Sequence, residues 1–523
     1  MPVKIKDMQY TFCFSRSGYV DNLKIPALIN TFSGDYYNSN YIEVMGEKFE
    51  KNIYYPTFLN GEKIVEGNKI IIIFNGMELI QRPAKLVDFV VGLRLKYGFK
   101  KLFYLQGVSD PYIIPVLVYL GIDLFDDIYI RKESADGIKY NFLGKSKTGD
   151  DPLIDNIGFV SAILNSLYDS IKNGTLRDVV EKISISGKAL EILRIIDLKY
   201  NKEYGKVFPS RTPYIQANSI EALDRPDIAL YRNKIEIYKK PAGRNIALLL
   251  PCSAKKPYSQ SKSHMKILSE ILQYRKYLHE LIVTSPVGLV PRELEYGYPA
   301  RYYDIPVIGV WYEDEKTMMK NLISRYLNNN DYSHVIAYIP EDLSFIEEVL
   351  PPSSTIIEGR VTAPENLAKL REALASIIQK DSQKGNNIDD YRALLRFQFG
   401  EWINKYLDNM NLINNFHQNM LVRKNKLLFI FNEKTGRFSI TPESAKFFLE
   451  NNKFNVGIDN FMPTSNVYAI GVQNATDDIR PYDEVIMTYN NELRGTGTAM
   501  MSYKAMVDLD AGVAIKVRKG IKD

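Results

Sequence analysis

One segment of fourteen residues concentrates side chains that could do chemistry. It reads PCSAKKPYSQSKSH, from Pro251 to His264, and holds a thiol, a phenol, an imidazole, three lysines and four serines. It follows the apolar run Ile246–Leu250, which predicts a buried strand. Open α/β sheets place their ligand crevice at the carboxyl ends of strands. The segment is therefore a candidate catalytic site.

Cys252 could act as a nucleophile. A thiol beside two lysines and near a helix N-terminus is expected to have a lowered pKa and more thiolate. A thiolate can add to an electrophilic carbon, including that of a nitrile, and a nearby acid can then protonate the nitrogen. The alternative is a buried structural cysteine at the end of a strand, which is common.

The neighbouring polar residues also admit two interpretations. His264 could exchange a proton near neutral pH, or it could cap a helix or make a surface contact. Lys255 and Lys256 could form only a solvated basic edge. The hydroxyls of Ser261 and Ser263 could simply cap the helix that follows.

A second polar segment follows the next predicted strand, Leu281–Val283, and would face the same crevice. It runs from Ser285 to Glu295 and includes Arg292 and Glu293. These charges could hold a free amino acid, whose ammonium needs a carboxylate and whose carboxylate needs a cation. Alternatively, the prolines and the glycine of this segment only shape a long loop.

Composition excludes several protein classes. The chain has 523 residues, is 45% hydrophobic and 25% charged, and carries a net charge of +5. These values are typical of a globular protein of three or four domains and exclude a mainly disordered chain, a collagen and a coiled coil. Two cysteines and four scattered histidines exclude a disulfide framework and a four-cysteine zinc site, and favour a reducing cytosol.

Positive charge gathers near the candidate site. The window from Cys252 to Lys276 holds six basic residues and one acidic residue, so its excess equals that of the whole chain. A basic loop that leads into a helix N-terminus suits an anionic ligand or a phosphate backbone. The longest apolar runs are far shorter than the ~20 residues that span a bilayer. With no signal peptide either, we expect a cytoplasmic protein without a membrane partner.

Apolar periodicity predicts an α/β multidomain protein with four regions, 1–243, 244–379, 380–454 and 455–523. In the first region, strands such as Lys69–Phe74 alternate with helices such as Lys85–Tyr97, which indicates a parallel sheet or a compact barrel. The second region repeats this alternation more clearly and predicts a doubly wound α/β core domain. The third is a small α+β connector that begins with the polar segment Lys380–Asp390. The last is a small all-β module.

Three local predictions concern the second region. The apolar spacing of Met265–Leu278 predicts one helix there. Val307–Val310 is a strand candidate. Thr362, followed by Ala363, Pro364 and Glu365, has the pattern of a capping box, with Thr362 at the N-cap.

The motif Pro251–His264, in a chain that ends in a small β module, resembles the archaeosine synthase family, on the archaeal side of the tRNA-guanine transglycosylase superfamily. The segment Ser285–Glu295 also resembles a family motif. The last region resembles a PUA domain, a small β-barrel RNA-binding module, through Leu493–Met500 and Gly512–Arg518.

The PUA resemblance implies a set of RNA contacts. Gly495 and Gly497 would let the backbone approach a phosphate, and Arg494, Lys516 and Arg518 would supply charge. A tight β turn with a basic C-terminal tail is the alternative.

The first region resembles the transglycosylase barrel in reduced form. Tyr119–Asp126 resembles the segment that supplies the aspartate nucleophile, at Asp123. The stretch that would carry the second catalytic aspartate is Phe74–Met77, which has none, and the zinc cysteines are absent. These departures argue against a metal site and against base exchange.

The resemblance implies a transferase that acts on tRNA carrying 7-cyano-7-deazaguanine in the D-arm. Free L-lysine would be joined through its side-chain nitrogen to the nitrile carbon, and a radical-SAM partner subunit would then split the adduct. No cofactor is expected, and a homodimer is left open. The catalytic candidates are Cys252, which could form a thioimidate, and Lys256, Tyr258 and His264, which would have acid or orienting roles. The candidates for substrate binding are Ser253, Ser261, Ser263, Ser285, Arg292, Glu293 and Asp123.

Three alternatives stay open at this point. Lysine could attack the nitrile directly, with Cys252 only structural. The chain could be a transglycosylase that exchanges the base itself, or a non-catalytic tRNA-binding scaffold for the radical-SAM partner.

Overall fold

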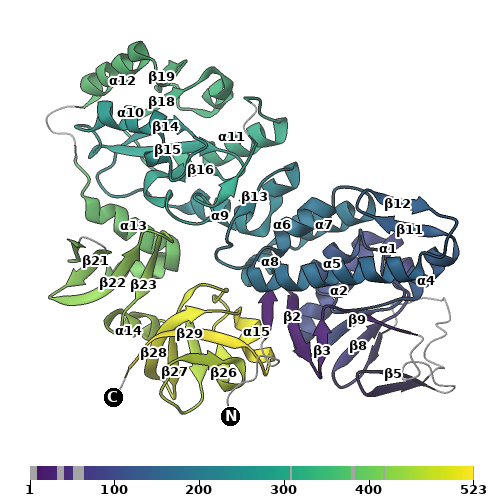
Figure 1. The fold of residues 1–523 in the computed structure, drawn as a ribbon. Coiled ribbons are helices and arrows are strands. Elements are labelled where there is room, and N and C mark those ends of the chain that lie inside the picture. Colours follow the sequence, from purple (N-terminus) through teal and green to yellow (C-terminus); the bar gives the residue numbers. More distant parts are fainter. Residues whose placement is uncertain are drawn as a thin grey trace. The chain divides into compact units, whose positions relative to one another are not determined.

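The computed structural model describes residues 9–31, 41–50, 64–306, 309–378, 383–415 and 418–521. The chain forms two compact units (Figure 1). Unit 1 comprises Met1–Pro213 and Asn452–Asp523, and unit 2 comprises Tyr214–Asn451. Unit 1 therefore joins the first region to the last, and the predicted division into four domains stays a prediction.

Unit 1 begins with half of a barrel, which confirms the predicted reduced barrel. Its five-stranded sheet has the order β4-β10-β9-β8-β7, and only β7 is antiparallel to its neighbour. The strands are β4 (Ala27–Ile29), β7 (Ile64–Glu66), β8 (Ile70–Ile73), β9 (Leu102–Leu105) and β10 (Leu124–Asp126). The helices are α1 (Gly76–Gln81), α2 (Pro83–Tyr97), α3 (Ile114–Leu120), α4 (Ile128–Ala135), α5 (Leu153–Asn173), α6 (Leu176–Ile183), α7 (Gly187–Lys199) and α8 (Asn201–Val207).

The central strand β8 explains why this sheet is covered on both faces. All four isoleucines of Ile70–Ile73 are buried. Ile71 and Ile73 pack in the core that the helices share, whereas Ile70 and Ile72 pack in a second cluster with Ile25 and Phe49. Small antiparallel sheets flank the half-barrel: β1 (Tyr10–Phe12), β2 (Ser15–Val20) and β3 (Leu23–Ile25); β5 (Tyr41–Val44) and β6 (Glu47–Glu50); and β11 (Ile138–Asn141) and β12 (Gly144–Lys147).

The end of the chain forms the predicted small β module, drawn in yellow in Figure 1. Its six strands have the order β25-β29-β28-β27-β24-β26. They are β24 (Asn455–Ile458), β25 (Asn466–Tyr468), β26 (Val472–Ala475), β27 (Glu484–Tyr489), β28 (Glu492–Ala499) and β29 (Val513–Gly520), with the short helix α15 (Tyr503–Asp508). The backbone N–H and the hydroxyl of Ser210 donate to the Pro481 carbonyl, which holds this module to the half-barrel.

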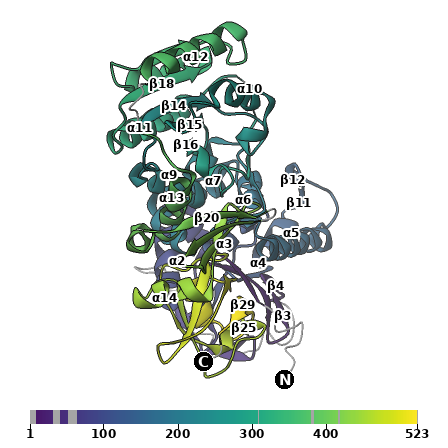
Figure 2. The ribbon, with the colours of Figure 1, turned by 90° about the vertical axis from the view of Figure 1, so that its left-hand side faces the viewer.

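Unit 2 contains the predicted doubly wound sheet, with the order β16-β15-β14-β18-β19. The strands are β14 (Ile246–Pro251), β15 (Leu278–Thr284), β16 (Gly288–Pro291), β18 (His334–Ile339) and β19 (Thr355–Glu358). Only β16 is antiparallel. Helices α10 (Lys262–Ile271) and α12 (Pro364–Ile377) pack on one face against Ile246, Leu248 and Leu250 of β14. Helices α9 (Pro226–Ile237) and α11 (Glu313–Asn328) contact each other and β16, and Figure 2 shows α10 and α11 on opposite sides of the sheet.

Unit 2 also contains β13 (Ile215–Gln216), which pairs with β17 (Tyr303–Asp304), and the predicted small α+β part. The latter consists of α13 (Asn387–Phe399), the four-stranded sheet β20 (Asn411–Asn415), β21 (Gln418–Arg423), β22 (Lys426–Asn432) and β23 (Arg437–Ile440), and α14 (Pro442–Glu450). The polar segment Lys380–Asp390 was predicted to be a loop. Residues 380–382 lie outside the described residues, and the segment's end is helical because Asn386 caps α13 through a capping box with Asp389.

Three local predictions differ from the structure. Helix α10 ends at Ile271, not near residue 278, because the chain must turn back through Tyr274 and Tyr277 to start β15. Ala363, not Thr362, is the N-cap of α12, and its side chain caps nothing. Of the strand candidate Val307–Val310, residues 307 and 308 lie outside the described residues and the other two are in no strand.

Within the ranges that the structure describes, every helix is too short or too polar to cross a membrane.

Candidate functional site

The Cys252 segment lies where the strand order of the doubly wound sheet reverses. Strand β14 pairs with β15 on one side and with β18 on the other, and both pairings are parallel. Cys252 follows the carboxyl end of β14, and Asp342, which follows β18, acts electrostatically on the thiol. Such a switch point is where open α/β sheets place ligands.

A chain of hydroxyl groups leads away from Cys252. The Thr284 hydroxyl donates a hydrogen bond to the Cys252 sulfur and also shares one with the Tyr303 hydroxyl. The Tyr303 hydroxyl lies 2.8 Å from that of Tyr258. Tyr303 and Tyr258 are buried, and the loss of solvent raises the pKa of each phenol far above the usual range of tyrosine. Both phenols are therefore neutral, and they orient the site rather than carry charge.

Thr284 and Tyr303 were not among the residues predicted from the sequence. Thr284 ends β15, directly before the motif that starts at Ser285, so its position next to a predicted strand end was the available signal. Tyr303 lies in the two-residue strand β17, 51 positions after Cys252, and no local pattern marks it.

Lys256 lies close to the thiol and is also partly buried. Its ammonium nitrogen lies 3.9 Å from the centre of the Tyr303 ring, in a cation–π contact. Burial lowers the pKa of Lys256, and the nearby Cys252 partly opposes this shift. The pair therefore consists of a thiol and an amine that gives up its proton more readily than an exposed lysine.

The predicted thiolate character of Cys252 is wrong. Burial raises the pKa of the thiol, and the hydrogen bond from Thr284 and the charge of Lys256 lower it by less. Desolvation disfavours the charged form, and this effect outweighs a single cation. Cys252 is thus a neutral thiol at rest, and it needs a base to become a nucleophile.

His264 is buried and hydrogen-bonded at both ring nitrogens. Arg292 donates to Nδ1 at 2.8 Å, so Nε2 carries the proton and donates to the Pro251 carbonyl at 2.9 Å. Burial and the Arg292 charge lower the pKa of His264 to about 4. The role of acid that the sequence suggested is therefore wrong for this geometry. His264 instead ties α10 to the end of β14 and so positions Cys252.

Arg292 is paired inside the protein. Its guanidinium donates to Glu280 at 2.7 Å and to Glu295 at 2.9 Å, and Glu295 in turn accepts from the backbone N–H of Ser259 at 2.9 Å. The Glu293 side chain is 6% exposed and lies between His279 at 3.1 Å and the Tyr238 hydroxyl at 2.7 Å. These charges already have partners, so they organise the loop after β14. Their binding of a substrate stays a prediction.

The serines of the motif mostly serve the local fold. Ser261 is the N-cap of α10 and accepts from the His264 N–H at 3.2 Å. Ser263 lies 3.3 Å from the Ser261 hydroxyl, and Ser253 donates to the Lys255 carbonyl at 2.9 Å. The Ser285 hydroxyl is different, because it is buried and has no partner among the residues that the structure describes.

Removal of the Arg292 charge should strongly destabilise unit 2. Arg292→Met leaves Glu280 and Glu295 as buried carboxylates with less compensation, which typically costs about 3–5 kcal/mol. Urea unfolding measures this cost. Arg275→Met is the matched control, because Arg275 pairs with the same Glu280 at 2.8 Å but is 40% exposed. Its loss should cost no more than about 1 kcal/mol, and equal costs for the two variants would contradict the assigned role of Arg292.

His264 should make stability depend on pH. Its pKa is about 4 when folded and 6.5 when exposed, so the unfolded chain binds more protons between these values. The contribution of His264 to the free energy of unfolding is therefore fully present above pH 6.5. It is lost as the pH falls toward 4, by about 3 kcal/mol in all. Urea unfolding from pH 4 to 7 should show this slope, and His264→Gln should flatten it. An unchanged slope in the variant would refute the buried neutral histidine.

The predicted RNA-binding residues of the last region have different environments. Gly495 and Gly497 are buried in β28, where an added Cβ would lie 2.8 Å and 2.6 Å from the carbonyl oxygens of Lys519 and Lys516. Their lack of a side chain serves the packing of β28 on β29, which corrects the expected approach to a phosphate. Arg494 pairs with Glu492 at 2.9 Å and Arg518 with Glu484 at 2.5 Å. Lys516 is exposed.

Asp123 is held in the core of unit 1. It pairs with Arg16 at 3.1 Å and Arg94 at 2.5 Å and accepts from the Phe103 N–H at 2.8 Å. Burial would raise its pKa, but the two arginines hold the pKa below its usual range. It precedes β10 and so lies at the amino end of the strand, away from the edge where barrels carry their active sites. Asp123 therefore serves the core of unit 1, as expected if it is a relic of a transglycosylase nucleophile, and its binding of a substrate stays a prediction.

No three histidine, cysteine or carboxylate side chains come together as a possible metal site in the part of the chain that the structure describes.

Two domain families match the sequence. The PUA domain matches residues 458–521, and a "Domain of unknown function (DUF5591)" matches residues 228–374, which include the Cys252 site. The half-barrel, the α/β unit that holds the Cys252 segment and the matched PUA domain together favour an RNA-modifying enzyme.

Whole-chain relatives then identify the family. "Archaeosine synthase subunit alpha" of Thermoplasma acidophilum is 46% identical over 98% of this chain and 99% of its own length. "Archaeosine synthase" of Haloferax volcanii is 30% identical over 79% of this chain and 76% of its own length. The chain belongs to the archaeosine synthase family and is a tRNA-modifying enzyme. A "tRNA-guanine(15) transglycosylase" of Methanococcus vannielii is 23% identical over 84% of this chain and 69% of its own length.

Proposed function

We propose that this protein adds free L-lysine, through its side-chain nitrogen, to the nitrile of 7-cyano-7-deazaguanine in the D-arm of tRNA. The observation that carries the proposal is the pair formed by Cys252 and Lys256 at the switch point of the sheet. A nitrile needs a nucleophile at carbon and a proton at nitrogen, and this pair can supply both.

The proposed reaction has two steps. Lys256, as a neutral amine, takes the thiol proton of Cys252. The sulfur bonds to the nitrile carbon, one carbon–nitrogen π bond breaks, and the nitrogen takes the proton from Lys256 to give a thioimidate. The side-chain amine of free lysine then bonds to the same carbon. The carbon–sulfur bond breaks, and the thiol regains the proton that the amine releases, leaving an amidine-type adduct on the base.

The environment of Cys252 supports these roles. The hydrogen bond from Thr284 stabilises the sulfur anion that forms in the first step. The Tyr303 ring keeps the Lys256 ammonium beside the thiol. Direct attack by lysine, with Cys252 structural, is the competing mechanism for the same net reaction.

Base exchange is a weaker candidate. It needs a free carboxylate nucleophile, and Asp123 is paired with two arginines. Asp126, at the carboxyl end of β10, accepts from the Tyr104 hydroxyl at 2.8 Å and the Gly107 N–H at 2.7 Å. Both carboxylates therefore have internal hydrogen-bond donors.

One assay separates the candidate functions. Purified protein is incubated with labelled lysine and tRNA that carries or lacks the cyano base. Label should enter only the tRNA with the cyano base. Labelled guanine entering unmodified tRNA would instead favour base exchange, and tRNA binding without any incorporation would favour a scaffold. A radical-SAM partner subunit that splits the adduct completes the proposal, since the Thermoplasma relative is named a subunit. A homodimer stays a prediction.

A further inference from the structure

A cavity in unit 1 lies between the half-barrel part and the PUA domain. Its volume is about 280 Å³. Strand β1 and the end of α5 contribute Tyr10 and Lys172, and the PUA domain contributes Asn466, Tyr482 and Lys516. This size is close to the lower limit for small-ligand pockets, about 300 Å³, and suits a single planar group with its substituents.

The lining combines aromatic rings with cations. The Lys172 ammonium lies 5.5 Å from the centre of the Tyr10 ring, and Lys516 also lines the cavity. The Arg211 guanidinium, which is not part of the lining, lies 5.1 Å from the centre of the Tyr482 ring. Lys172 and Lys516 are exposed residues, and no ion pair of either lysine occurs among the described residues. Both ammonium groups are therefore available to an anion.

Two further features mark the cavity as a binding site. The side-chain oxygen of Gln9, another lining residue, is buried and has no hydrogen-bond partner within the described ranges. Buried acceptors are costly unless a donor satisfies them. Tyr482 has a left-handed backbone with φ 70°, which bulky residues rarely adopt and which is enriched at ligand sites.

We infer that this cavity binds one unpaired nucleotide of the RNA substrate. A base can stack on a tyrosine ring, the Gln9 and Asn466 amides can bond its edge, and the two lysines can contact flanking phosphates. The inference rests on the proposed function in that tRNA is the source of the nucleotide. It gives the PUA domain and the half-barrel a shared role, since neither alone encloses the site.

The test measures tRNA binding by pocket variants over a range of salt concentrations. Tyr482→Asn removes the ring, and asparagine accepts a left-handed backbone well, so the fold should survive. The dissociation constant should rise about 5- to 150-fold, because a base loses its stacking partner. Lys172→Ala and Lys516→Ala should each reduce the slope of log affinity against log salt by about one.

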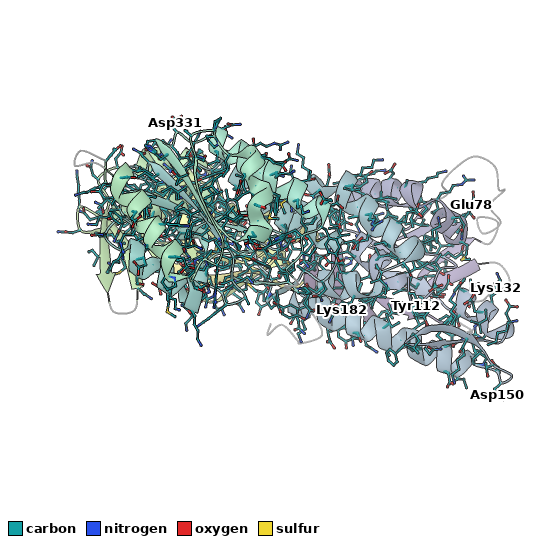
Figure 3. The ribbon with its side chains drawn as sticks, turned by 90° about the horizontal axis from the view of Figure 1, so that it is seen from above. Glu78, Tyr112, Lys132, Asp150, Lys182 and Asp331 are labelled. Carbon is teal, nitrogen blue, oxygen red and sulfur yellow. The ribbon has the colours of Figure 1, made fainter. Side chains whose placement is uncertain are left out.

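Lys182→Ala is the matched control. Lys182, labelled in Figure 3, is an exposed lysine on α6 of the same unit. It does not line the cavity. This variant should bind tRNA like the wild type, and thermal unfolding should show that all four variants fold. Tyr482→Asn and Lys172→Ala binding tRNA as Lys182→Ala does would overturn the inference.

Calorimetry with free nucleoside monophosphates distinguishes the source of the nucleotide. Weak binding of the monophosphates, together with pocket-dependent binding of tRNA, supports a nucleotide within RNA. Tight binding of a monophosphate by the wild type, with no effect of the variants on tRNA, would overturn it. Lysine incorporation by the wild type is read separately. Incorporation with pocket-independent tRNA binding refutes only the cavity, and pocket-dependent binding without incorporation refutes only the proposed function.

Discussion

Cys252→Ala should reduce lysine incorporation by at least ~10³-fold, because the covalent step loses its nucleophile. Cys252→Ser should be almost as inactive. A hydroxyl is a far weaker nucleophile, and Lys256 cannot deprotonate it as readily as a thiol. Initial rates with labelled lysine and tRNA carrying the cyano base measure both variants.

Cys13→Ala is the matched control for this prediction. The chain has two cysteines, and Cys13 is buried in the core of unit 1, far in the sequence from the motif. Its replacement should leave the incorporation rate near that of the wild type. Turnover by Cys252→Ala close to the wild-type rate would refute the covalent mechanism and favour direct attack by lysine.

The intermediate itself can be observed. Without lysine, the wild-type protein should accumulate a covalent adduct with the tRNA, which intact-mass spectrometry detects after nuclease digestion. Cys13→Ala should form the same adduct and Cys252→Ala should form none. An adduct that persists in Cys252→Ala would place the nucleophile elsewhere.

The location of Cys252 was predictable, whereas its charge state was not. The run Ile246–Leu250 is a clear buried strand, and open α/β sheets bind ligands at the carboxyl ends of their strands. The pKa of the thiol depends instead on burial beside Thr284 and Tyr303, which come from other strands. Local sequence shows the two lysines and not the desolvation that opposes them.

The role of Arg292 could not be predicted from its motif either. Its spacing from Glu293 and Glu295 suggests a site for a zwitterion, but the residues that pair with it include Glu280 and His264, from a strand and a helix before it. Asp123 likewise fits a family segment by its neighbours in sequence. Its partners Arg16 and Arg94 lie 107 and 29 positions away in the sequence, and their positive charges balance that of the carboxylate.

Lys256→Arg should reduce incorporation about 10²- to 10⁴-fold, the usual contribution of one general acid–base group. Arginine keeps the positive charge and can lie over the Tyr303 ring, yet it cannot lose a proton at accessible pH. Lys256→Gln, which removes both the charge and the base, should be similarly inactive. If the positive charge alone mattered, arginine would rescue much of the activity that glutamine loses.

The pH profile tests whether Lys256 acts as a base. Burial lowers its pKa below the ordinary 10.5, and the neutral amine is the form that accepts the thiol proton. The wild-type rate should therefore rise with pH through that lowered pKa, and Lys256→Gln should lack this limb of the profile. Lys255→Gln removes the adjacent lysine, which is exposed, and should keep both the rate and the limb. Loss of the limb in Lys255→Gln, or its survival in Lys256→Gln, would assign the base to another residue.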